Sequence, residues 1–134
     1  MLDHTLDELL LAHLKTVPAL AALHGYTGQD NAEHKLPALT VSTTSEPLAG
    51  SDTAFRGAVG VIIESEAHDT TAATHGERVE AVRFALANRA AVIAAINATG
   101  RLHIYGYAPL GTEPTAGDAR FNTKLRYRFG FGPA

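Results

Sequence analysis

RFNTKLRYRFGFG, residues 120–132, has the pattern of a β-strand with two different faces. Side chains alternate between the two faces of a strand, so this stretch separates into two rows. One row is largely apolar and can enter a core: Phe121, Thr123, Leu125, Tyr127 and Phe129. The other row is polar and carries four cations: Arg120, Asn122, Lys124, Arg126 and Arg128. The pattern predicts a sheet with one face on a core and the other face open.

The remaining segments predict further strands and helices around this one. Alternating apolar residues indicate strands at 39–43, 55–66 and 102–107. The flanking Pro37 and Pro47 favour an edge position for the first, and the length of the second favours a bend or two neighbours. Helical spacing indicates helices at 5–17, behind the capping box that starts at Thr74, and at 89–98 after a break at Asn88. Residues 19–24 are expected to form a short helical turn, and 26–36 and 109–118 are expected to be loops.

This order of elements predicts one α+β domain over residues 1–134, with an N-terminal helix at 5–17 and a sheet with helices over 37–129. We expect a mostly antiparallel, twisted sheet of about four strands with helices packed on one face. The polar row of residues 120–128 then lies on the free face.

Composition excludes several classes of protein. The 134 residues include no cysteine, which rules out disulfides, thiolate metal sites and cysteine nucleophiles. Hydrophobic residues make up 46% and charged residues 19%, as in ordinary globular proteins. The formal net charge is −3, so any basic surface must be local. No apolar stretch is long enough to span a membrane, and no signal peptide is recognisable, so we expect a soluble intracellular product.

Enzyme motifs are missing from the sequence. It contains no Gly-x-Ser-x-Gly, phosphate-binding loop or dinucleotide fingerprint. The carboxylate pair Glu64 and Glu66 lies on one strand face, where solvation or pairing with cations is the common arrangement. We therefore expect no catalytic residues, no cofactor and no metal. A small metal-binding or ligand-binding domain that uses His68, His75 and His103 remains an alternative, although their spacing matches no metal motif.

The basic row allows two interpretations. Glu64 and Glu66 can sit opposite Arg126 or Arg128 and form cross-strand ion pairs, which are weak when exposed. Alternatively the surplus of cations faces the acidic surface of a partner. Tyr105 and Tyr107 are expected on the same open face, and tyrosine and arginine are enriched in protein interfaces. Nucleic acid is a weaker partner, because the stacking aromatics of the last strand point to the other face.

The order of elements resembles the small tail terminator and tail completion proteins of long-tailed bacteriophages. The resemblance covers residues 36–129 and lies in the stretches LPALTV, FRGAVGVIIESEA, HGERVEAVRFALAN, LHIYGY and RFNTKLRYRFG. It implies an α+β fold and a ring, typically of six subunits, that caps the tail tube, stops its polymerisation and provides the surface for head joining. Catalytic residues and cofactors are not part of that family, so none carry over.

The resemblance implies an interface role for the charged residues. In a ring of identical subunits, acidic residues of one copy can meet the basic row of the next. The acidic set is Glu64, Glu66, Glu77 and Glu80, and the basic set is Arg120, Lys124, Arg126 and Arg128. The row can instead face the tube or the DNA that passes through the lumen. Loops at 28–35, 47–53 and 110–118 are candidates for docking elements.

The implied partners are other copies of the chain, the tail tube protein and head–tail connector or neck proteins, with no membrane. The implied location is the tail or neck of the virion, after assembly in the host cytoplasm. A neck or head-completion adaptor is the alternative role.

Overall fold

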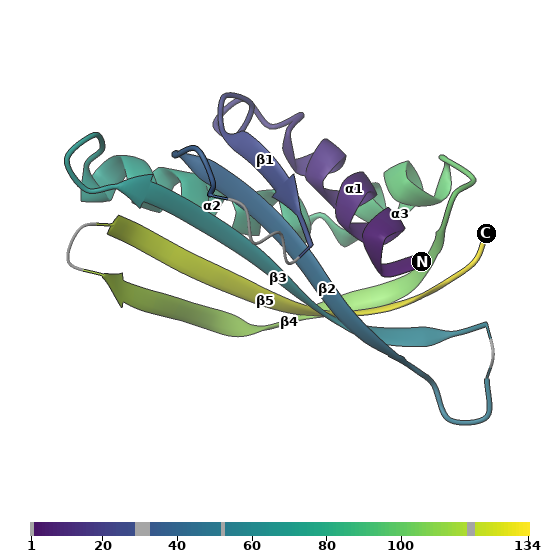
Figure 1. Ribbon diagram of the computed structural model, residues 1–134. Helices are drawn as coiled ribbons and strands as arrows, with labels where there is room; N and C mark the ends of the chain where they lie inside the picture. Colours follow the sequence, from purple (N-terminus) through teal and green to yellow (C-terminus); the bar gives the residue numbers. More distant parts are fainter. Residues whose placement is uncertain (1, 29–32, 52, 118–119) are drawn as a thin grey trace.

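The computed structural model describes residues 2–28, 33–51, 53–117 and 120–134, and side chains in all of these except 114–117. Within these residues the chain forms three helices and five strands (Figure 1). They are α1 (Leu2–Leu14), β1 (His24–Thr27), β2 (Ala38–Pro47), β3 (Phe55–Glu66), α2 (Ala72–Ala87), α3 (Arg89–Asn97), β4 (His103–Gly117) and β5 (Arg120–Gly132). The helices cover one face of a single twisted sheet, as Figure 1 shows, so the predicted α+β class is confirmed.

Strands β3 and β5 form the centre of the sheet, whose order is β1-β2-β3-β5-β4. They pair antiparallel without a break from Phe55 opposite Phe131 to Glu66 opposite Arg120. β3 also pairs with β2 from Phe55 to Glu64, which confirms that the long strand has two neighbours. The central position of β5 makes one of its faces the floor of the core and leaves the other open.

The core lies between this sheet and the helices. The apolar row of β5 enters it as predicted, with Leu125, Tyr127 and Phe129 buried. Val59, Val61 and Ile63 of β3 lie beside them. The helices contribute the following buried residues: Leu6, Leu10 and Leu14 from α1, Val79, Val82 and Leu86 from α2, and Val92 and Ile96 from α3. Burying such side chains is the main source of folding free energy.

The sheet has five strands because of β1, which the sequence pattern did not predict. Residues 24–27 read HGYT, with neither a hydrophobic run nor strict alternation. They pair parallel with residues 38–41 of β2 through the backbone, so the sheet is mixed. The expected edge position of β2 is therefore wrong for residues 38–41, whereas residues 42–47 pair only with β3 within the described part of the chain.

Strand β4 continues to Gly117, whereas residues 109–118 were expected to be a loop. The long β5 provides a template for pairing along this whole stretch. The register between β4 and β5 shifts at two irregularities, one between Ile104 and Gly106 and one between Pro109 and Gly111. Gly111 has a φ of +137°, which only glycine adopts readily. Asp118 lies outside the described residues.

Helix boundaries differ from those predicted. α1 begins at Leu2 and ends at Leu14 instead of spanning the predicted 5–17, so Thr5 lies inside the helix, and Asp7 is buried. The N-cap of α2 is Thr71 rather than Thr74, since Thr71 Oγ1 accepts a hydrogen bond from Thr74 N at 3.1 Å. The break at Asn88 between α2 and α3 is confirmed. Residues 19–23 form turns and no helix.

Candidate functional site

The polar row of β5 lies on the sheet face opposite the helices, as predicted. On this open face Lys124 is opposite Ile62, Arg126 is opposite Gly60, and Arg128 is opposite Ala58. Figure 1 shows that no helix covers this face. Because no helix covers it, the open face is the first candidate for binding a partner.

None of the described helices is long and apolar enough to cross a membrane.

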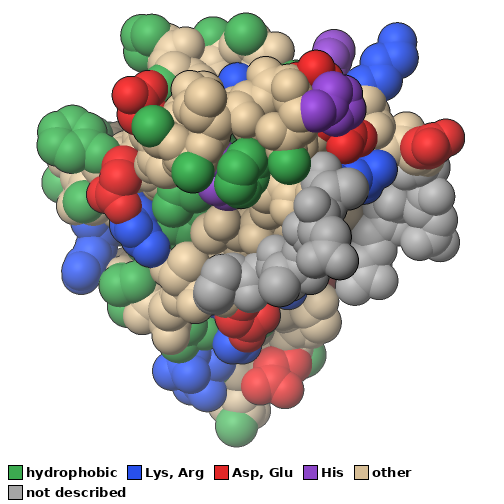
Figure 2. Space-filling model, turned by 90° about the vertical axis from the view of Figure 1, so that its left-hand side faces the viewer, with side chains coloured by type: hydrophobic (Ala, Val, Ile, Leu, Met, Phe, Trp, Pro, Cys, Tyr) green, Lys and Arg blue, Asp and Glu red, His purple; other side chains and the backbone are tan. Residues whose placement is uncertain are grey.

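One end of the open face is neutralised within the chain. Arg120 lies 3.8 Å from Glu64 Oε2 and 3.7 Å from Glu66 Oε1. His34 Nδ1 approaches Glu64 at 3.8 Å, and the His34 ring stacks on Tyr26 with centroids 4.0 Å apart. Figure 2 views this end of the molecule and shows acidic and basic side chains next to one another.

The ion pairs of this end differ from the expected ones. Glu64 and Glu66 face Asn122 and Arg120 in the register of β3 and β5, so the expected pairing with Arg126 or Arg128 is wrong. Arg126 instead pairs with Glu113 of β4 at 3.1 Å. Glu64 is only 17% exposed, which leaves little of its carboxylate for a neighbouring subunit.

Cations that have no ion-pair partner among the described residues extend from the middle of the open face to its other end. Arg56, Lys124 and Arg128 form no ion pair with any residue that the structure describes. Arg56, Arg126 and Arg128 line a hollow of about 350 Å³, here called the basic trough. Its other lining residues are Thr44, Ser45, Glu46, Gly57, Ala58 and Leu110.

Small residues make the floor of the basic trough low. Ala58 of β3 lies opposite Arg128, and Gly130 of β5 lies opposite Arg56. Gly60 lies next along β3, and the Lys124 side chain crosses it, since a Cβ at Gly60 would meet Lys124 Cε at 2.7 Å. The long cationic side chains thus stand above a flat floor. This arrangement suits an extended acidic surface better than a small ligand.

The two tyrosines expected on the open face are separated. Tyr105 is 58% exposed and meets the His103 ring edge-on at 4.8 Å. Tyr107 is buried at 6% exposure, so its predicted outward position is wrong. The irregularity between Ile104 and Gly106 adds one residue to β4 and shifts the alternation, which turns Tyr107 toward the core.

The histidines do not converge on a metal site with any residue that the structure describes. No group of three potential metal ligands converges anywhere in the described part of the chain. His75 is buried, with its Nε2 2.9 Å from Thr123 Oγ1 and its ring stacked on Phe121. Burial lowers the pKa of His75, so its ring is neutral near pH 7. His68 is exposed beside Asp69 on the β3–α2 connection.

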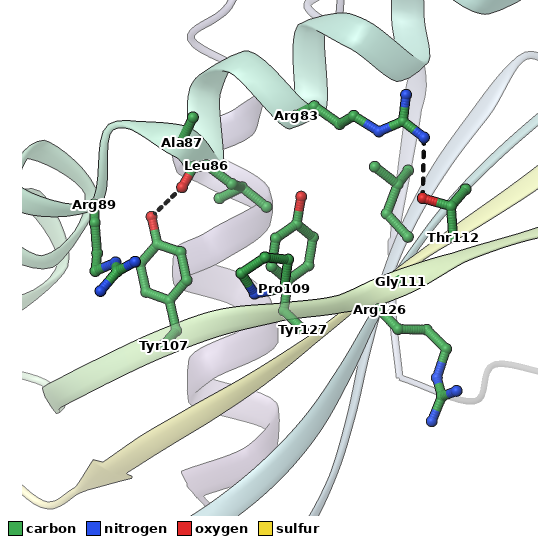
Figure 3. Close-up of a pocket in the computed structure, with 11 residues that line it drawn as sticks. Arg83, Leu86, Ala87, Arg89, Tyr107, Pro109, Gly111, Thr112, Arg126 and Tyr127 are labelled. Carbon is green, nitrogen blue, oxygen red and sulfur yellow. Dashed lines mark hydrogen bonds between the residues drawn. The ribbon is translucent and has the colours of Figure 1, made fainter.

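A cavity of about 390 Å³ lies between α2 and the β4–β5 ribbon, and we call it the α2 cavity (Figure 3). Its lining residues are Arg83, Leu86, Ala87, Arg89, Tyr107, Pro109, Gly111, Thr112, Leu125, Arg126 and Tyr127. Sequence reasoning missed it, because it depends on Tyr107 facing inward. The apolar run around Leu86 indicated a core helix but gave no sign of a hollow beside it.

Polar contacts hold the walls of the α2 cavity in place. The Tyr107 hydroxyl donates a hydrogen bond of 2.6 Å to the Leu86 carbonyl oxygen, and Arg83 donates one of 3.0 Å to Thr112 Oγ1. The Arg89 guanidinium lies 6.0 Å from the Tyr107 ring centroid, within the range of a cation–π contact. Burial raises the pKa of Tyr107 to about 12 and also raises the pKa of Tyr127, so both hydroxyls stay protonated.

Comparisons with known proteins add little to this geometry. No family model matches the sequence, and no curated protein matches it. One solved protein structure aligns with 93% of this chain and 93% of its own, at a TM-score of 0.44 and 17% sequence identity. That likeness is too weak to indicate a function.

Proposed function

We propose that this protein is a structural component of a long-tailed phage particle, which forms a ring that caps the tail tube, ends tube polymerisation and provides the head-joining surface. The observation that carries the proposal is the open sheet face, where Arg56, Lys124 and Arg128 form no ion pair with the described residues and stand over a floor of small residues. The order of elements and its resemblance to the terminator proteins supply the identity of the partner.

The open face suits a protein partner with acidic side chains. Desolvated arginine forms paired hydrogen bonds with carboxylates and is enriched in interfaces. Arg126 is already held by Glu113, and Arg120 by Glu64 and Glu66, so these pairs fix the shape of the face. Arg56, Lys124 and Arg128 then remain for contacts with a neighbouring subunit or the tube protein. Genomic DNA only passes through the lumen.

The test is a capping assay with purified tail tube protein. We expect the wild-type protein to shorten the tubes and to be seen as a ring at one tube end by negative-stain imaging. Arg128→Glu should abolish capping, because it reverses a charge on the open face. Arg101→Glu is the matched control, since Arg101 is equally an exposed arginine but pairs with Glu8 of α1 on the helix side.

The outcomes separate the roles. Wild-type protein that leaves tubes unchanged but binds DNA-filled heads would replace the terminator role with the neck adaptor role. Protein that binds neither would overturn the proposal. Equal capping by wild type and Arg128→Glu would remove the open face from the mechanism. Circular dichroism of both variants establishes that they are folded.

A further inference from the structure

We propose that the α2 cavity receives the Phe84 side chain of a second copy of this chain. The contact is between copies, goes beyond the tail role and does not depend on it. It assigns a function to two features that the open face leaves unexplained: a large exposed aromatic residue and an open cavity.

Phe84 is the first of these features. Its side chain lies on α2 and is 84% exposed, the highest value among the large hydrophobic residues that the structure describes. Ala81, Ala85 and Val17 surround it and extend the apolar surface. Figure 2 shows hydrophobic side chains exposed among charged ones on the helix-bearing part of the molecule. Removing a phenylalanine side chain from water is strongly favourable, so an interface is the expected place for it.

The α2 cavity is the second feature. Leu86, Pro109 and Leu125 give it an apolar lining, and its volume of about 390 Å³ falls in the range of pockets that enclose a ligand. The Tyr127 hydroxyl points toward the helix in Figure 3. Aromatic anchors that fill such pockets dominate the energetics of many protein interfaces.

Phe84 cannot fill the cavity of its own chain. Leu86 lines the cavity and Phe84 lies two residues before it. Two residues correspond to a rotation of about 200° around an α-helix, so the two side chains point to nearly opposite sides of α2. The projection and the cavity are therefore different surfaces of one chain. Such a contact is heterologous, and its repetition builds rings or chains rather than a closed pair.

Charge complementarity favours a second copy as the occupant. Glu77 and Glu80 precede Phe84 by two turns and one turn on the same side of α2, and both are exposed. The rim of the cavity carries Arg83 and Arg89, whereas the Arg126 side chain points away from the cavity in Figure 3. Docking Phe84 thus brings acidic residues of one copy toward arginines of the next. Glu80 is held by Arg83 of its own helix, so Glu77 and Arg89 are the pair free to meet.

Strand addition is a poor alternative at this place. β4 is the outer strand of the sheet beside the cavity. However, its two irregularities and Pro109 interrupt the row of backbone groups that another strand would need. A side chain that enters the cavity requires no such row.

The experiment measures self-association of the full chain by native mass spectrometry and sedimentation over a wide concentration range. Phe84→Ser removes the projection, and Ala87→Trp fills the cavity from its rim. Both should reduce the protein to a monomer. Tyr105→Ser removes an exposed aromatic elsewhere, and Ala94→Trp adds a tryptophan to an exposed position of α3; both controls should associate like the wild type.

Mixing the two defective variants provides the decisive measurement. Phe84→Ser keeps an intact cavity and Ala87→Trp keeps an intact projection, so together they should form a dimer and nothing larger. A dimer that accumulates only in the mixture supports the proposal. A wild-type protein that is monomeric at every concentration, or a mixture that stays monomeric, overturns it.

The result is distinguishable from failure of the tail role. If wild type is monomeric but Phe84→Ser and Ala87→Trp lose tube capping, the cavity binds the tube protein and the self-docking proposal is wrong. If the mixture dimerises while the wild type caps no tubes, the contact between copies holds and the tail role fails.

Discussion

The Thr43 hydroxyl on β2 donates a hydrogen bond of 2.5 Å to Oδ1 of Asp7 on α1. Asp7 is only 2% exposed, so a carboxyl group lies inside the contact between helix and sheet. Ser45 donates a hydrogen bond to Asp3 in the same way, two residues further along β2. These bonds fix the position of α1 along β2, because each hydrogen bond requires one particular partner. Apolar packing of the α1 leucines has no such requirement.

Stability should depend on pH through Asp7. Burial raises the pKa of Asp7 from 3.8 to about 6. The folded state therefore holds a proton that the unfolded state releases, and stability falls as pH rises from about 4 to about 6. At about 1.4 kcal/mol per pKa unit the loss is roughly 2–3 kcal/mol.

Asp7→Asn isolates this effect. Urea unfolding at a series of pH values should give a smaller loss of stability between pH 4 and pH 6 for the variant than for the wild type. Two parallel curves would show that Asp7 is ionised in both states at the same pH.

His75 should have the opposite effect. Burial lowers its pKa below the usual 6.5, so the unfolded state takes up a proton first as the pH falls. The stability from neutral His75 is present above pH 6.5 and is lost as the pH falls through this value. His75→Leu keeps the buried volume and should remove that loss. A thermal-unfolding series from pH 7 to pH 5 measures it, and an unchanged pH profile would contradict the assignment.

Gly57 should not tolerate a side chain. A Cβ there would lie 2.8 Å from Cε1 of the buried Phe131 and 3.0 Å from Thr43 Cγ2. We expect Gly57→Ala to cost about 1–3 kcal/mol, the usual range for overpacking. Gly106→Ala is the control, because nothing lies within 4 Å of a Cβ at that position. Equal unfolding midpoints for the two variants would mean that the Phe131 ring moves aside without cost.

The hydroxyl groups of the two tyrosines in the α2 cavity should contribute differently to the free energy of unfolding. Tyr107→Phe removes the hydrogen bond to the Leu86 carbonyl and should cost about 1 kcal/mol. Tyr127→Phe should change stability by less, since its hydroxyl forms no hydrogen bond to the part of the chain that the structure describes. Equilibrium unfolding of both variants tests this. A larger cost for Tyr127→Phe would reverse the roles assigned to the two side chains.

Much of the fold was predictable because the central strands carry strong local patterns. The alternation in 120–129 correctly assigned the core row and the open row of β5, and the alternation in 55–66 correctly predicted the long strand β3. The break at Asn88 was equally visible. β1 was not, because HGYT carries no pattern of its own and pairs only through its backbone with β2.

The candidate site was only partly predictable. The sequence indicated a basic row on an open face, and the structure places it there. No local pattern indicated that Arg120 would pair with Glu64 and Glu66, or that Arg126 would pair with Glu113, because both contacts depend on the register between strands. The α2 cavity and the exposure of Phe84 depend on how α2 packs, which no local pattern reveals.

The sequence by itself determined the α+β class, the two faces of β3 and β5, and the presence of a cationic row. These follow from the two-residue period of an extended chain, which is a local property. Only the tertiary structure decided which cations remain unpaired, where Tyr107 points and where a cavity opens. One extra residue between Ile104 and Gly106 reverses the faces of β4, and such an irregularity exists only against a partner strand.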